Sequence, residues 1–123
     1  MSKITVDNLR KASESADRDI SGVAAAWGKA NGAGTTINDS LNISSITDSG
    51  TGWITWNMNN DMASGDYSAC NNSQLNSITG TGGFYSNGDL AAATAGSFAI
   101  SHYQNGVAAD PSYYSVQIHG DLA

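Results

Sequence analysis

The stretch from Ser40 to Met58 constrains the fold of this chain more than any other segment. Two runs rich in β-branched and aromatic residues, Leu41–Thr47 and Trp53–Met58, flank a linker of Asp, Ser, Thr and Gly. Residues of these types favour turns, and glycine tolerates the positive φ angles that a tight hairpin needs. The pattern therefore predicts a β-hairpin closed by the five-residue loop Asp48–Gly52, and it favours an all-β fold.

Short strands are expected along most of the chain. The sequence is rich in Thr, Ser and Gly and holds a single glutamate, Glu14, a balance that disfavours long surface helices. The expected strands are Val23–Lys29, Thr35–Asn38, Leu41–Thr47, Trp53–Met58, Tyr67–Asn71, Gly83–Tyr85, Ser97–Tyr103 and Tyr113–His119. Their spacing predicts an antiparallel β-sandwich or a jelly-roll-like domain, with a long loop at Asn72–Asn87.

The N-terminal segment differs from this body. From Val6 to Val23 small or apolar residues recur at alternating spacings of 3 and 4, which is a heptad-like stripe weakened by Ser13 and Ala16. We therefore expect a partly helical attachment segment, residues 1–22, followed by a β-sandwich body, residues 23–123. Alternatively, the start of the chain is extended and adds a strand to another protein. The expected docking residues are Lys3, Val6, Leu9, Arg10, Lys11, Arg18 and Ile20.

Charge is distributed unevenly between the two parts. The formal net charge is −6, and no Lys or Arg follows Lys29. Because affinity for nucleic acid comes mainly from cations that neutralise phosphates, we expect no nucleic-acid partner for the acidic body. No apolar stretch reaches the about 18 residues of a transmembrane helix, so no membrane span is expected. Cys70 is the single cysteine, and its strand-like surroundings predict a small buried side chain.

Few residues of the body could carry catalysis or bind a metal. Most of its aspartates stand next to Gly, Asn, Ser or Pro, where aspartate usually caps a turn rather than pairing with a second carboxylate. His102 and His119 could hold zinc together with Asp121, but their strand phases place His102 inward and His119 outward. We therefore expect no catalytic residues, no metal and no cofactor, and we do not expect an enzyme.

Three aromatic residues are the candidates for recognition. Trp53 begins a strand on the face opposite Ile54 and Trp56, and Tyr103 and Tyr113 have a similar position on other expected strands. Aromatic side chains on a second sheet face suit a contact between subunits, and they also suit a platform on which a sugar ring stacks. Trp53, Tyr103 and Tyr113 are therefore expected at an oligomer contact or a glycan contact.

The sequence INDSLNISSITDSGTGWITWNM, which spans Ile37–Met58, resembles a recurrent domain in virion proteins of tailed bacteriophages. Those proteins are mostly tail or tail-fibre proteins, many from phages of aquatic bacteria. Met1–Leu9 and Ile118–Ala123 resemble the two ends of that domain. Gly22–Trp27 resembles its first strand, where AKAW is usual and this chain has AAAW. Residues 66–112 match nothing in that family.

The resemblance implies a virion structural protein that assembles in the cytoplasm of the host bacterium. The expected form is a short fibre or spike of the tail-fibre type, a homotrimer, attached to other virion proteins through its N-terminal segment. The alternatives are a decoration protein of the capsid or neck, and a lectin-like module that binds a glycan of the host surface. The similar segments are structural, so the resemblance implies no catalytic chemistry.

Overall fold

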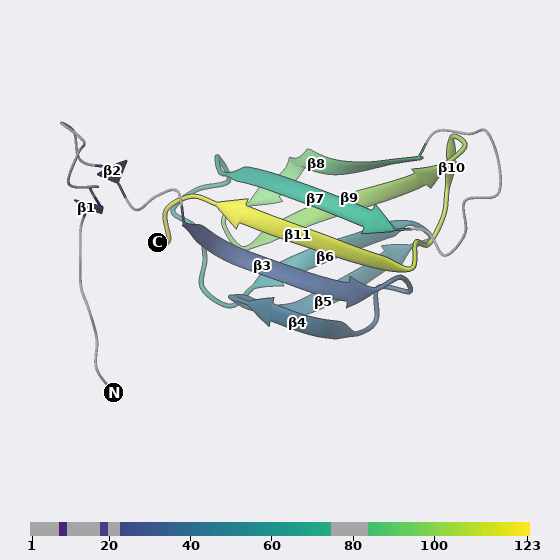
Figure 1. The fold of residues 1–123 in the computed structure, drawn as a ribbon, viewed down its shortest axis with the longest axis horizontal. Coiled ribbons are helices and arrows are strands. Elements are labelled where there is room, and N and C mark those ends of the chain that lie inside the picture. Colours follow the sequence, from purple (N-terminus) through teal and green to yellow (C-terminus); the bar gives the residue numbers. More distant parts are fainter. Residues whose placement is uncertain (1–7, 10–17, 20–22, 75–83) are drawn as a thin grey trace.

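The computed structural model describes residues 8–9, 18–19, 23–74 and 84–123, with side chains described for residues 23–73 and 93–123. Every regular element in these residues is a β-strand (Figure 1). The strands are β1 (Asn8–Leu9), β2 (Arg18–Asp19), β3 (Ala24–Asn31), β4 (Ile37–Leu41), β5 (Ile43–Gly50), β6 (Trp53–Met58), β7 (Ser68–Gln74), β8 (Phe84–Thr94), β9 (Ser97–Gln104), β10 (Val107–Ala108) and β11 (Tyr113–His119). The predicted all-β class is confirmed for this part of the chain.

Strands β3 to β11 form two antiparallel sheets, which lie one in front of the other in Figure 1. The first, the β3 sheet, has the strand order β4-β3-β11-β7. The second, the β6 sheet, contains β5, β6, β9, β8 and β10. Ser101 of β9 pairs with both β6 and β8, so those two strands flank β9 on opposite sides. Tyr103 pairs with both β8 and β10, so β10 lies on the same side of β9 as β6.

Buried side chains from both sheets form one hydrophobic core. In β6, β9 and β11 every second residue points into this core, as the alternation of the sequence predicts. These inward residues are Ile54, Trp56, Met58, Phe98, Ile100, His102, Tyr114, Val116 and Ile118. The two sheets are therefore held together by the burial of their facing apolar surfaces.

Trp56 occupies the centre of this core with 0% of its surface exposed. The inner face of β3 opposite it carries only small residues, Ala26, Gly28 and Ala30. A Cβ atom at Gly28 would lie 2.6 Å from Cζ3 of the indole ring. The missing side chain at Gly28 thus leaves the space that the large ring of Trp56 fills.

The predicted hairpin is present, but its loop is shorter than five residues. β5 extends to Gly50 and β6 begins at Trp53, and these two residues pair directly. A register shift between Asp48 and Gly50 lets the ladder continue into the expected loop, and the Asp48 carboxylate accepts the Gly50 N–H at 2.9 Å. Gly50 and Gly52 have φ angles of 124° and 75°, so the expectation of positive φ at glycine is confirmed.

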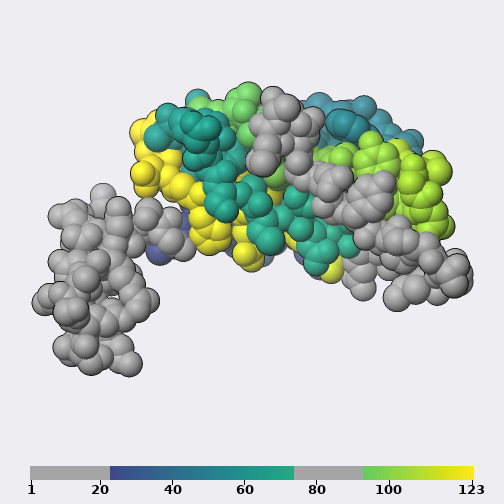
Figure 2. Space-filling view, turned by 90° about the horizontal axis from the view of Figure 1, so that it is seen from above, coloured from purple at the N-terminus to yellow at the C-terminus, as the bar shows by residue number. Residues whose placement is uncertain are grey.

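The region between β7 and β9 contains more strand than its composition indicates. β7 extends to Gln74 and β8 covers Phe84–Thr94, where only a strand at 83–85 is expected. β8 pairs with β9 and β7 pairs with β11, whose teal and yellow atoms adjoin in the view from above (Figure 2). The expected loop at Asn72–Asn87 is therefore wrong at both of its ends, and residues 75–83 lie outside the described chain.

The expected N-terminal attachment segment is described at four residues only. There Asn8 pairs with Asp19 and Leu9 pairs with Arg18, which forms the two-residue strands β1 and β2. These four residues are extended, and the rest of the expected partly helical segment lies outside the described residues. The same holds for the side chains of the expected docking residues, Lys3, Val6, Leu9, Arg10, Lys11, Arg18 and Ile20.

Candidate functional site

The outer face of the β3 sheet presents an aromatic and polar surface. Antiparallel register places side chains of neighbouring strands in rows across this face. One row runs through Leu41, Trp27, Gln117 and Cys70, and the next runs through Asp39, Lys29, Ser115 and Asn72. Both rows belong to the strand phase opposite the buried residues, so they point away from the core.

A depression of about 340 Å³ lies across these two rows. Its lining comes from three adjacent strands, namely residues 27–29 of β3, 70–72 of β7 and 115–117 of β11. At its centre stands the small side chain of Ser115, whose hydroxyl donates to the Asn72 carbonyl at 3.4 Å. The longer side chains of Trp27, Lys29 and Gln117 also line the depression.

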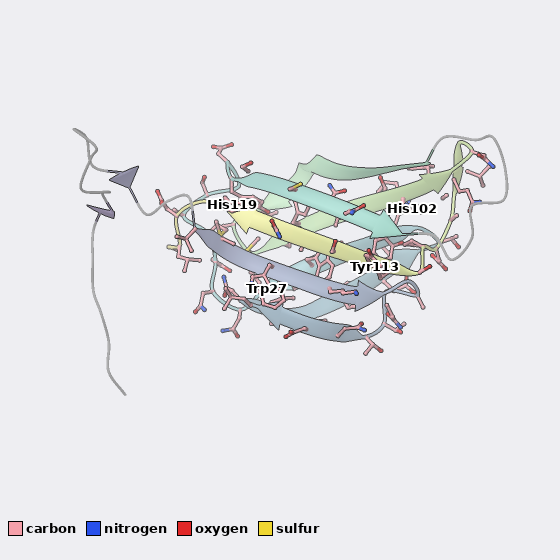
Figure 3. The ribbon with its side chains drawn as sticks, in the orientation of Figure 1. Trp27, His102, Tyr113 and His119 are labelled. Carbon is pink, nitrogen blue, oxygen red and sulfur yellow. The ribbon has the colours of Figure 1, made fainter. Side chains whose placement is uncertain are left out.

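Tyr113 extends this surface beyond the depression through a contact with Lys29 of the lining. The Lys29 ammonium nitrogen lies 4.4 Å from the centroid of the Tyr113 ring, which is a cation–π contact. Figure 3 shows Trp27 and Tyr113 on neighbouring strands of this face, displaced along the strand direction. Lys29 is the only Lys or Arg after Arg18 in the sequence, and this contact places its charge against an aromatic ring.

The three aromatic residues predicted for recognition are not brought together. Trp53 is 36% exposed on the outer face of the β6 sheet. Tyr103 stands two residues beyond Ser101, the partner of Trp53, so it belongs to the same face. Tyr113 lies instead on the outer face of the β3 sheet, on the opposite side of the molecule. The structure therefore offers two distinct aromatic surfaces.

Trp27 is the aromatic residue that the list of candidates missed. Its segment, AAAWGKA, has Ala26, Gly28 and Ala30 in one strand phase and Trp27 and Lys29 in the other. The small phase is the buried one because it faces Trp56 of the other sheet. Hydrophobicity alone would place a tryptophan inward, so the signal was a size pattern rather than a hydrophobic one.

Cys70 is exposed, so the prediction of a buried cysteine is wrong. Its backbone pairs with Gln117, whose side chain also points outward, and residues opposite each other in a ladder share a face. The residues around Cys70 correctly predicted a strand, but not the direction of the cysteine side chain. In β7 Ala69 is half-buried and its two neighbours, Ser68 and Cys70, are exposed. Cys70 thus belongs to the surface around the depression.

The two histidines lie on different sheets, and Figure 3 shows them toward opposite ends of the molecule. His102 is 1% exposed and points inward, whereas His119 is half-buried on β11, as their strand phases predict. Among the described residues no group of three His, Cys, Asp or Glu side chains could hold a metal ion.

His102 belongs to a polar cluster at the Gly52 turn, in which His102 is buried, Ser73 is half-buried and Asp110 is exposed. Its Nδ1 atom lies 2.5 Å from the Ser73 hydroxyl, and its Nε2 atom has no hydrogen-bond partner among the described residues. The Asp110 carboxylate accepts the Gly52 N–H at 2.6 Å. Ser73, His102 and Asp110 are the residue types of a catalytic triad, but the carboxylate engages the turn rather than the imidazole. The described contacts therefore do not form the hydrogen-bond chain of a triad.

Burial controls the ionisation of this cluster. It lowers the pKa of His102 below the usual value of 6.5, and the negative charge of Asp110 opposes this effect in part. Burial raises the pKa of Tyr114, and the charges of Asp110 and Asp48 raise it further. The phenol oxygen of Tyr114 has no hydrogen-bond partner among the described residues. At neutral pH His102 and Tyr114 are therefore both uncharged.

Acidification from about pH 7 to pH 5 is expected to destabilise the wild-type protein more than a His102→Asn variant. Because the pKa of His102 is lowered in the folded state, the unfolded state takes up the proton more readily. The stability due to the neutral imidazole is thus complete above about pH 6.5 and is lost as the pH falls toward the folded pKa.

Urea unfolding of both proteins at the two pH values measures this difference. The two proteins differ at position 102 alone, so the difference between their pH-dependent losses reports on the imidazole and its interactions. Equal losses in the wild type and the variant would show that the imidazole of His102 does not contribute to the acid sensitivity.

No protein-family model matches the sequence, and no match is found among curated proteins or solved structures. Among the described residues, no helix has the length and apolar character needed to cross a membrane.

Proposed function

We propose that this protein is a bacteriophage virion structural protein that forms a short fibre or spike of the tail-fibre type. In this proposal residues 1–22 attach to other virion proteins, and residues 23–123 form a β-sandwich body that projects from the particle. Two antiparallel sheets with a common core support the sandwich assignment. Most Lys and Arg residues lie in residues 1–22, whereas the body is acidic. This difference supports separate roles for the two parts, attachment for the first and projection for the second.

One observation carries the proposal. The body segments that resemble the phage family, 22–27, 37–58 and 118–123, are distant in sequence but adjacent in the fold. They supply β4, β5, β6, the start of β3 and the end of β11. They also line a groove of about 480 Å³, together with Asn59 and Asn60. The described part of residues 66–112, which do not resemble the family, supplies β7, β8 and β9 at the other edge of the two sheets, and the short strand β10. The similar segments thus form one contiguous part of the fold, which supports the proposal.

A homotrimer is the assembly that this proposal includes. Trp53 and Tyr103 occupy one outer face of the β6 sheet, close to the small, buried residues Ala99 and Ser101. Aromatic side chains without neighbouring cations are typical of the centres of subunit interfaces. The outer face of the β6 sheet is therefore the surface that we assign to contacts between copies of the chain.

Mass spectrometry of purified phage particles tests the virion assignment. Peptides of this protein are expected at a constant ratio to the major capsid protein, and replacing Lys3, Arg10 and Lys11 by Gln is expected to lower that ratio several-fold, since each exposed ion pair contributes about 0.2–1 kcal/mol. The matched control is Lys29→Gln on the body, which should leave the ratio unchanged. A protein that is abundant in infected cells but absent from particles would refute the proposal.

The position on the particle separates the fibre from its first alternative. A symmetric cryo-EM reconstruction is expected to place the body at the tail. Density for it on the capsid or neck would favour a decoration protein.

A lectin-like function of the body is a second candidate, and the depression on the β3 sheet is the observation that favours it.

A further inference from the structure

The depression on the outer face of the β3 sheet has a mixed lining. The aromatic side chain of Trp27 lies on β3, the amide of Gln117 stands next to it on β11, and the amide of Asn72 lies on β7, two strands away from β3. The floor is formed by Ser115 and by sheet backbone at Gly28, a position whose side-chain direction is toward the core. Its volume of about 340 Å³ lies in the lower part of the range of small-molecule sites. An aromatic surface beside several hydrogen-bond donors and acceptors is complementary to a pyranose ring. Such a ring has an apolar C–H face and hydroxyl groups around its edge.

The charges of this surface narrow the class of ligand. Lys29 is the only cation at the depression, and its backbone pairs with that of Asp39 on β4. A phosphate-rich polymer needs several Lys or Arg contacts, and the body has no others after residue 29. A peptide that adds a strand pairs along a sheet edge, whereas this depression lies on the face of the sheet, across β3, β11 and the edge strand β7. A neutral sugar requires neither cations nor an edge.

We propose that this depression binds a neutral pyranose of a host-surface glycan. The sugar ring lies against the indole of Trp27, and its hydroxyl groups form hydrogen bonds with Gln117, Asn72 and Lys29. Because Lys29 contacts the Tyr113 ring, its ammonium group is held near the rim rather than free to move through solvent. Gln117 and Asn72 both offer a donor and an acceptor, as pairs of neighbouring hydroxyls require.

This site deepens the proposed function, because it gives the projecting body a ligand class. It also assigns different tasks to the two outer faces, with ligand binding on the β3 sheet and subunit contacts on the β6 sheet. A shallow site with one stacking ring binds weakly, with a dissociation constant of about 1 mM for a monosaccharide. A trimer would increase the apparent affinity for a multivalent surface by linking three such sites.

Nuclear magnetic resonance of the full-length protein tests the proposal directly. The chain has 3 tryptophans, so its spectrum contains three indole N–H signals, from Trp27, Trp53 and Trp56. The probes are the methyl glycosides of glucose, galactose, mannose, rhamnose and N-acetylglucosamine, titrated separately to tens of millimolar. At least one of them is expected to shift the Trp27 signal saturably while the signals of Trp53 and Trp56 stay in place.

Two matched variants separate this site from other surfaces. Trp27→Ala is expected to weaken binding of that sugar at least tenfold, whereas Trp53→Ala on the opposite face should leave it unchanged. The Trp56 signal reports whether each variant retains its core, because that side chain is fully buried. Gln117→Ala should weaken binding several-fold without removing the aromatic wall.

Three outcomes would overturn the proposal. The first is the absence of a saturable shift with all of the sugars. The second is equal binding by wild type and Trp27→Ala, or a shift confined to Trp53. The third is the same Trp27 shift with inorganic phosphate, which would identify an anion site at Lys29. Each result is obtained with purified protein, so it is independent of whether the protein is found in phage particles.

Discussion

Replacing Trp56 by Ala is expected to lower the free energy of unfolding by about 3–5 kcal/mol, because Trp56 is the largest fully buried side chain among the described residues. The indole ring is fully buried and spans the space between the two sheets. The facing strand cannot fill the resulting cavity, because it presents glycine and alanine at Gly28, Ala26 and Ala30. Urea unfolding followed by circular dichroism measures the loss.

Trp53→Ala is the matched control, because it removes the same side chain from the same strand on the exposed face. Its expected cost is about 1 kcal/mol. Trp56→Phe keeps an aromatic ring and removes the indole N–H, which has no hydrogen-bond partner among the described residues. Its loss should therefore be well below that of Trp56→Ala. Similar losses for Trp56→Ala and Trp53→Ala would contradict the assignment of Trp56 to the centre of the core.

Replacing Gly52 by Ala is expected to cost about 3 kcal/mol or more of stability. Gly52 has a φ angle of 75°, which is unfavourable for residues with a Cβ atom. An added Cβ would also lie 2.5 Å from the carbonyl oxygen of His102 and 2.9 Å from the backbone nitrogen of Ala109. Both contacts are with backbone atoms, which cannot move aside by a side-chain rotation.

Any displacement of this turn would also break hydrogen bonds. The Gly52 carbonyl accepts the His102 N–H at 2.7 Å, and the Gly52 N–H donates to Asp110 at 2.6 Å. Gly106→Ala is the matched control, because Gly106 has a φ of 79° but no described atom lies within 4 Å of its added Cβ. The control should lose only about 1–2 kcal/mol, the cost of the backbone conformation. Thermal and urea unfolding compare the two variants, and equal losses would show that the turn is not packed as described.

Much of the fold could be predicted because β-strands have a simple period. The alternation in residues 53–58, 97–103 and 113–119 predicts both the strands and the side chains that face the core. The glycines around Thr51 predict the hairpin and its positive φ angles. β8 was largely missed, since much of Phe84–Thr94 is small and polar and its extended state depends on pairing with β9.

The candidate sites were less predictable for a related reason. Periodicity shows that Tyr103 and Tyr113 point away from the core, but it does not show which sheet each strand joins. They therefore share a predicted role and lie on opposite faces. Trp27 was missed because its exposure depends on Trp56, a residue of the other sheet.

The amino-acid order alone determined the β class, the main strands, the inner faces of β6, β9 and β11, and the concentration of cations before residue 30. These are local properties, which follow from the period of a strand, the conformational freedom of glycine and the sum of charges. Only the tertiary structure decided which strands are neighbours, and with them the depression beside Trp27, the burial of His102 against Ser73 and the exposure of Cys70. Such pairings join residues far apart in the chain, and they are chosen by how side chains of different size fit between two sheets.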